Sequence, residues 1–136
     1  MTTGRARLLL AVGRVAVASL FVLGGLSKLA DYAGTADRMA EAGVAPALLP
    51  AVIALELGGG AMVAIGRRGA ALAALALVGH VALVNLLFHP FWSVAGPMRA
   101  VEVSLFFKNV AVAGSLLLIA GLASLPPTRD EDSSHA

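Results

Sequence analysis

The sequence predicts an all-α protein that crosses a membrane four times as an antiparallel helix bundle. Of its 136 residues, 59% are hydrophobic and only 13% are charged, whereas a soluble domain carries about 25% charged residues. The apolar residues form four segments of about 20 residues each, the length that crosses a hydrocarbon core of about 30 Å. None of them alternates like a barrel strand, so helices are the structure that satisfies their backbone polar groups in lipid.

The four predicted spans and their connections divide the chain as follows. The spans cover residues 8–30, 47–65, 69–88 and 101–123, within one domain of residues 1–124. The first connection, residues 31–46, mixes charged and apolar residues and could form a short interfacial helix. The second is the tight basic turn GRRG, and the third, HPFWSVAGPMR, has the prolines, glycine and tryptophan of an interfacial loop. These short connections favour an antiparallel bundle, and the polar, acidic residues 125–136 predict a disordered tail.

The basic residues predict the orientation of the bundle. Five of them lie on the side of the termini: Arg5, Arg7, Arg67, Arg68 and Arg129. Only Arg38 and Arg99 lie clearly in the opposite loops. The positive-inside rule therefore places both termini and the acidic tail in the cytoplasm. The alanine-, arginine- and valine-rich composition is typical of a GC-rich bacterium, so we expect a multi-pass protein of a bacterial plasma membrane.

A signal peptide is the alternative interpretation of the first span. Arg5 and Arg7 resemble a charged leader, and VAVASLFVL resembles its apolar core. Arg14 interrupts this run, however, and no small-residue cleavage site precedes Lys28.

Composition also excludes several classes of function. The chain has no cysteine, which excludes disulfides, thiol redox chemistry and cysteine-ligated metal or iron–sulfur centres. The net charge is +2, and the basic residues do not cluster with aromatic ones, so nucleic acid is not an expected partner.

Ionisable residues inside the spans are the main candidates for function, because such residues are rare in membrane helices. They are Arg14, Lys28, Glu56, His80, Glu102 and Lys108, with Asn85 and Asn109 as polar companions. Counted along straight helices from the outer ends, Glu56, His80 and Lys108 lie roughly 15, 13 and 12 Å deep. A lone charge there costs several kcal/mol, so we expect Glu56 to pair with Lys108 or His80.

A second group of polar residues lies above these three, toward the outer face. It comprises Lys28, Asn85, His89, Trp92, Glu102 and Asn109. Asn85 and His89 share a helix face at a spacing of four, and Glu102 and Asn109 share one at a spacing of seven. We therefore expect a polar pocket with an apolar floor in the outer half of the bundle.

Each of these residues also has a purely structural interpretation. Glu56 and Lys108 could form an ion pair that fixes helix register, and His80 could be a hydrogen-bonded packing residue. Arg14 and Lys28 could extend toward the two interfaces, and Trp92 could be an interfacial anchor.

Glycine and histidine patterns add two further expectations. Gly24, Gly25 and the motif ELGGG most simply let helices approach closely. His80 and His89 are about half a turn out of phase and roughly 13 Å apart on one straight helix, so they do not predict a metal site. His135 lies in the acidic tail, and no haem site is evident.

Several short motifs follow one another in a fixed order along the chain. They are Arg14, FVLGGLSKLADY, GVAP, ALELGGGAMVAIGRR, FHPFW and FFKNVAVAGSLLLI. From Arg14 to Ile119 this order resembles the DoxX family of small four-helix membrane proteins. The matching positions are Arg14, Gly25, Lys28, Glu56, Gly59, His89, Lys108 and Asn109, while His80 and Trp92 match less closely. Lys28 falls in the family's G-L-x-K element, which favours a retained helix end over a cleaved leader.

The resemblance implies a membrane protein linked to redox chemistry. The family is named for a subunit associated with a quinone-linked thiosulfate-oxidising system, and relatives are membrane partners in oxidoreductase complexes that handle oxidative stress. Our leading hypothesis is therefore a membrane subunit of a redox complex whose pocket binds a quinone-like headgroup. The alternatives are an anchor for soluble oxidoreductases and a small transporter, which would need to form a homo-oligomer.

This hypothesis assigns roles to ten residues. Glu56, His80 and Lys108 would hydrogen-bond the headgroup or relay its protons, because quinone reduction consumes protons that buried ionisable groups can supply. The residues expected to bind the molecule are Arg14, Lys28, Asn85, His89, Trp92, Glu102 and Asn109. Electrons would come from a partner protein or a diffusible donor.

Overall fold

The computed structural model describes residues 3–67 and 69–125. Its helices are α1 (Thr3–Ala30), α2 (Tyr32–Glu41), α3 (Leu49–Ala54), α4 (Gly60–Ile65), α5 (Ala70–Phe88) and α6 (Pro97–Ser124). A π-helical turn, Leu55–Gly59, joins α3 to α4, and short 3₁₀ turns cover Pro46–Leu48 and Phe91–Ser93. The predicted acidic tail, apart from its first residue, lies outside the described residues, as does Arg68 of the basic turn.

Four of the helical segments are long and apolar enough to cross a membrane. They are Gly4–Ala30, Pro46–Ile65, Ala70–Ser93 and Pro97–Ser124. The predicted all-α fold with four spans is therefore confirmed. The first and last helices begin several residues earlier than the hydropathy of the sequence indicates, because their first turns carry polar residues such as Arg5 and Arg99.

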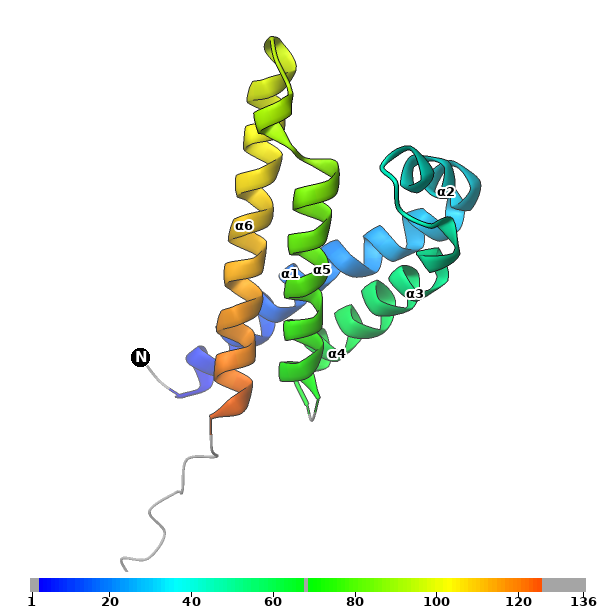
Figure 1. Cartoon of the computed structure of the whole chain (residues 1–136). Helices are drawn as coiled ribbons and strands as arrows, with labels where there is room; N and C mark the ends of the chain where they lie inside the picture. The colour runs from blue at the N-terminus through cyan, green and yellow to red at the C-terminus, as the bar shows by residue number, and fades with distance from the viewer. Residues whose placement is uncertain (1–2, 68, 126–136) are drawn as a thin grey trace, which may run out of the picture.

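The spans are arranged as two antiparallel pairs (Figure 1). One pair is α5 and α6, which lie side by side, and the other is α1 with the α3–α4 segment. The two pairs cross at a steep angle and separate toward the end where α2 lies (Figure 1). At the crossing, an apolar core contains Ala18, Phe21, Val63, Leu77 and Leu116.

Glycines allow close contacts between α1 and the α3–α4 segment, as expected for Gly25 and the ELGGG motif. A Cβ on Gly25 would lie 2.8 Å from Leu57, and one on Gly60 would lie 3.0 Å from Val22 and 3.3 Å from the carbonyl oxygen of Ala18. Small residues at such positions let membrane helices pack backbone to backbone.

The short helix expected between the first two spans is present as α2. The carboxylate of Asp31 caps it by accepting a hydrogen bond from the backbone N–H of Gly34 at 3.2 Å, which satisfies a donor that the first turn leaves free. Met39 packs in a small buried group with Leu49 and Ile53, against which Phe88 also packs. These contacts hold α2 across the opening between the two helix pairs.

Candidate functional site

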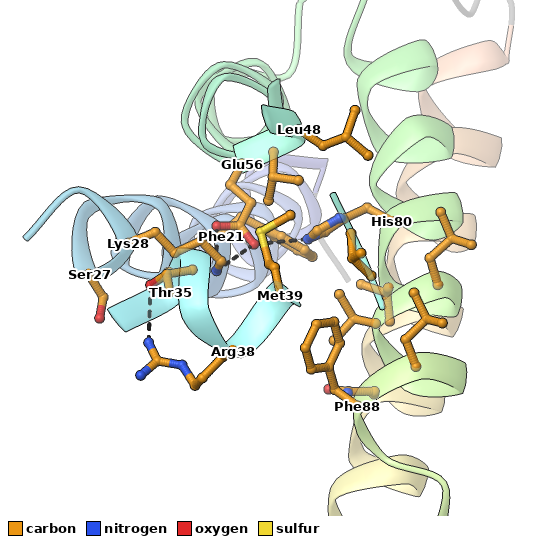
Figure 2. A pocket seen from close by; sticks show the side chains of 18 of the residues that line it. Phe21, Ser27, Lys28, Thr35, Arg38, Met39, Leu48, Glu56, His80 and Phe88 are labelled. Carbon is orange, nitrogen blue, oxygen red and sulfur yellow. Dashed lines mark hydrogen bonds and ion pairs between the residues drawn. The ribbon is translucent and has the colours of Figure 1, made fainter. Parts of the chain in front are cut away.

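Three ionisable side chains from three spans meet inside the protein (Figure 2). Lys28 Nζ of α1 donates to Glu56 Oε1 and Oε2 at 2.9 and 2.8 Å. Nε2 of His80 on α5 lies 2.9 Å from Glu56 Oε1. The side chains of Glu56, His80 and Lys28 are 6%, 11% and 28% exposed. We call these residues the Lys28–Glu56–His80 cluster.

The π-helical turn positions Glu56. Such a turn inserts one residue into an α-helix and occurs frequently at functional sites. It begins at Leu55, so Glu56 lies within it and faces α1 and α5. Gly59 closes the same turn, and a Cβ there would lie 3.3 Å from Leu77 of α5. The absence of a side chain at Gly59 therefore helps bring Glu56 within reach of His80.

Lys28 reaches the cluster by folding back along its own helix. A Cβ on Gly24 would lie 3.6 Å from Lys28 Nζ and 3.4 Å from Glu56 Oε2. The amine of Lys28 is therefore level with Gly24, one turn nearer the N-terminus of α1. Helical side chains lean in this direction. A residue count that follows Cα positions places Lys28 near the outer surface, whereas its charge lies beside Glu56.

Of the two partners expected for Glu56, His80 is confirmed and Lys108 is not. Lys108 is exposed and makes no hydrogen bond or ion pair with another described residue. The reason is that α6 extends past the C-terminal end of α5, so counting residues from the two helix ends does not find side chains at the same depth. Asn109 donates to the side-chain oxygen of Asn85 at 3.0 Å, so Lys108 lies level with Asn85, about 7 Å along α5 from His80.

A cavity of about 550 Å³ lies beside the cluster, between α1, α2, α3 and α5. Five of the predicted residues line it: Lys28, Glu56, His80, His89 and Asn109. Apolar side chains, including Phe21, Val84 and Phe88, form much of its wall. This volume and this mixture of apolar walls with a few polar groups are typical of small-molecule sites.

Sequence reasoning missed the contribution of α2 to this cavity. Thr35, Arg38 and Met39 of α2 line it, and Figure 2 shows Met39 facing it together with Phe21 and Phe88, while Arg38 turns toward Thr35. Arg38 donates to Asp31 Oδ2 at 3.1 Å and to the hydroxyl of Thr35 at 3.0 Å. The spacing of four between Thr35 and Met39 was the available signal, because both positions fall on the buried face of a short helix.

Exposed leucines also line the cavity, and they show where it opens. They are Leu20, Leu48, Leu83 and Leu87, each at least 45% exposed. Exposed leucines on a membrane helix face acyl chains, so the cavity opens sideways to the lipid.

Four of the predicted residues form polar pairs that link α6 to α5 and to the loop between the two helices. Asn85 donates to the carbonyl oxygen of Phe106 at 3.0 Å and accepts from Asn109. Nδ1 of His89 lies 2.9 Å from Glu102 Oε2. Asn85 and Glu102 do not line the cavity, so their contacts join the two helices and hold the cavity-lining Asn109 and His89 in place.

Trp92 and Arg14 lie away from the cavity. Trp92 is exposed and meets Phe91 and Phe106 edge to face, with ring centroids 5.2 and 5.9 Å apart. Arg14 packs on the end of α4: a Cβ on Gly66 would lie 2.5 Å from its guanidinium carbon. A cation at the end of a helix is favourable, so the structural interpretation suits Arg14.

The described residues offer no metal site. No group of three or more His, Cys, Asp or Glu side chains that could hold an ion occurs in residues 3–67 and 69–125. The histidines of the cavity are instead paired with carboxylates.

Comparisons with known proteins agree with these features. The DoxX family model matches residues 9–90. The chain is 35% identical over 109 residues to "Inner membrane protein YqjF" of Escherichia coli (strain K12), which covers 80% of this chain and 79% of that protein. It is 31% identical over 120 residues to "Inner membrane protein YphA" of the same organism, which covers 86% of this chain and 85% of that protein. No solved structure matches the chain significantly. With its four spans, this chain is an integral inner-membrane protein that belongs to the DoxX family.

Proposed function

We propose that the protein binds a quinone-like molecule in the cavity beside the Lys28–Glu56–His80 cluster, as the membrane subunit of a redox complex. The observation that carries this proposal is the composition of the cavity. Its walls are largely apolar, and a hydrogen-bonded group of ionisable residues lies on one side. A quinone headgroup has matching features, because it joins a flat apolar ring to two polar oxygens.

The cluster also suits the proton chemistry of quinones. A quinone takes up two electrons and two protons to become a hydroquinone, and the reverse reaction releases them. Lys28 and His80 are nitrogen donors within hydrogen-bond distance of the same carboxylate oxygen, so a proton exchanged with a headgroup at His80 or Lys28 could be shared among the three side chains. The chain has no cysteine, and we propose that a partner oxidoreductase exchanges the electrons.

Lateral opening of the cavity supports a lipid-soluble ligand. The exposed leucines at its edge would contact the apolar tail of a membrane quinone while the headgroup lies near His80. The headgroup could then reach the cluster from the bilayer without passing through water.

Equilibrium binding to the full chain in lipid nanodiscs tests this proposal. The probe is a decyl-substituted benzoquinone, and the variant is Glu56→Gln, which weakens the attachment of Lys28 and His80. Glu41→Gln, the same change on the exposed end of α2, is the matched control. We expect saturable binding that weakens at least tenfold in Glu56→Gln and stays unchanged in Glu41→Gln. Absence of saturable binding, or equal binding by wild type and Glu56→Gln, would reject the proposal.

A further inference from the structure

We infer that the cavity prefers the reduced, hydroxyl-bearing form of its ligand, a hydroquinone, because His80 presents an unpaired acceptor nitrogen to it. This inference rests on the proposed function and deepens it. It follows from the protonation of His80, from the surroundings of its second ring nitrogen, and from the chemistry of the two ligand forms.

Glu56 determines which nitrogen of His80 carries a proton. The ammonium of Lys28 contacts both oxygens of Glu56, and this arrangement favours a carboxylate, which only accepts hydrogen bonds. Nε2 of His80, at 2.9 Å from Oε1, must therefore be the donor.

Charge balance indicates that His80 is neutral. Lys28 and Glu56 cancel each other, so a protonated His80 would leave one net positive charge inside a membrane span, where a charge is costly. Neutral His80 with its proton on Nε2 has a lone pair on Nδ1, which is a hydrogen-bond acceptor.

Nδ1 of His80 is both unpaired and accessible. Among the described residues, the hydrogen bond of His80 is the one from Nε2 to Glu56. Within the described residues, Nε of Arg14 is the one side-chain nitrogen or oxygen that is both buried and without a partner. Nδ1 of His80 also has no partner but is not buried in this sense, so part of its surface is open. His80 lines the cavity. His89 pairs with Glu102 through Nδ1 at 2.9 Å, so its Nε2 is a second acceptor at the cavity. It lies nine residues, roughly 13 Å, along the chain from His80 and does not contact the Lys28–Glu56–His80 cluster.

An acceptor in the cavity distinguishes the two redox forms of the ligand. The carbonyl oxygens of a quinone only accept hydrogen bonds, whereas each hydroxyl of a hydroquinone can donate one to Nδ1. Lys28 can donate to the oxygen of either form and does not discriminate between them. A hydrogen bond lost from a dry site typically costs about tenfold or more in affinity, so we expect at least a tenfold preference for the hydroquinone.

Anaerobic binding to the full chain in nanodiscs tests this inference with three probes: a decyl-substituted hydroquinone, the corresponding quinone, and the dimethyl ether of the hydroquinone. We expect the hydroquinone to bind at least tenfold more tightly than the other two. His80→Phe should abolish this preference. His80→Gln should retain much of it, because its amide keeps both a donor for Glu56 and an acceptor for the ligand. Size-exclusion profiles confirm that each variant is folded.

The possible outcomes separate this inference from the proposed function. If the quinone binds saturably and as tightly as the hydroquinone, the preference is wrong and the quinone-binding function stands. If none of the three probes binds saturably, both fail. A preference that persists unchanged in His80→Phe shows that another group accepts the hydroxyl proton, and it overturns the assignment to His80.

Discussion

At the scale of single residues, the charge of Glu56 is compensated by Lys28 at 2.8 Å, and the same carboxylate accepts a hydrogen bond from His80 at 2.9 Å. Removing one member of a buried ion pair leaves the other uncompensated, which costs about 3 kcal/mol or more. We therefore expect Glu56→Gln to lower the free energy of unfolding by up to about 3 kcal/mol. The loss is limited because Lys28 is partly exposed, so water can solvate its charge. The double variant Lys28→Met/Glu56→Gln should recover most of the lost stability. Thermal unfolding in detergent measures both effects.

The exposed ion pair of Arg38 and Asp31 provides the control for this experiment. Its side chains are 60% and 59% exposed, and such surface pairs contribute about 0–1 kcal/mol. Arg38→Gln should therefore change stability by less than about 1 kcal/mol. If Glu56→Gln costs no more than Arg38→Gln, the Lys28–Glu56–His80 cluster does not stabilise the fold.

Counting residues along a helix locates the Cα atoms but not the ends of the side chains. This limits how much of the site the sequence predicts. The pairing of Glu56 with His80 was predictable, because both occupy the middle of their helices. The pairing of Lys28 was not, because its side chain leans one turn back from its Cα. The position of Lys108 was predicted wrongly, because the offset between α5 and α6 depends on the Asn85–Asn109 contact and not on the length of either helix.

At the scale of elements, the π-helical turn is the feature that sequence reasoning did not predict. The glycines of ELGGG indicated close helix packing, and the contact of Gly59 with Leu77 confirms it. The extra residue of the turn leaves no mark on composition or hydropathy, because an uninterrupted α-helix would place a similar number of apolar residues in the span. The direction of the Glu56 side chain therefore depends on a local backbone change that only the structure shows.

The close contact between α1 and the π-helical turn predicts a difference between two glycines. A Cβ on Gly25 would lie 2.8 Å from Leu57, whereas nothing lies within 4 Å of one on Gly79 of α5. Gly25→Ala should destabilise the protein by about 1–3 kcal/mol, as overpacking typically does. Gly79→Ala should be neutral or stabilising by up to about 1 kcal/mol, because alanine favours a helix. Thermal unfolding in detergent compares the two variants.

A second substitution tests the cause of the Gly25 effect. Truncating the neighbour in Gly25→Ala/Leu57→Ala frees the space that the new methyl group needs, so the double variant should be less destabilised than the sum of the two single variants. Strictly additive losses would indicate that Gly25 and Leu57 act independently and that α1 does not depend on this contact.

At the scale of the whole molecule, the number of spans was predictable and their arrangement was not. Length and hydropathy define a span, whereas neighbours in a membrane are selected by packing, because lipid tails are as apolar as leucine. The crossing of the two helix pairs brings small residues into the contact, such as Gly59, where a Cβ would lie 3.3 Å from Leu77, and Ala74 of the core. The cavity forms where the pairs separate, and α2, which belongs to no span, closes part of it.

The distribution of arginines predicts which way this cavity faces. If both termini are cytoplasmic, as the positive-inside rule indicates, α2 lies at the outer surface and the α4–α5 turn lies inside. The chain has no cysteine, so Asp37→Cys and Arg67→Cys, both at exposed positions, can be labelled separately. A membrane-impermeant maleimide should label Asp37→Cys once the outer membrane is opened, and Arg67→Cys only after the inner membrane is lysed. The opposite pattern would place α2 and its side of the cavity in the cytoplasm, within reach of soluble cytoplasmic oxidoreductases.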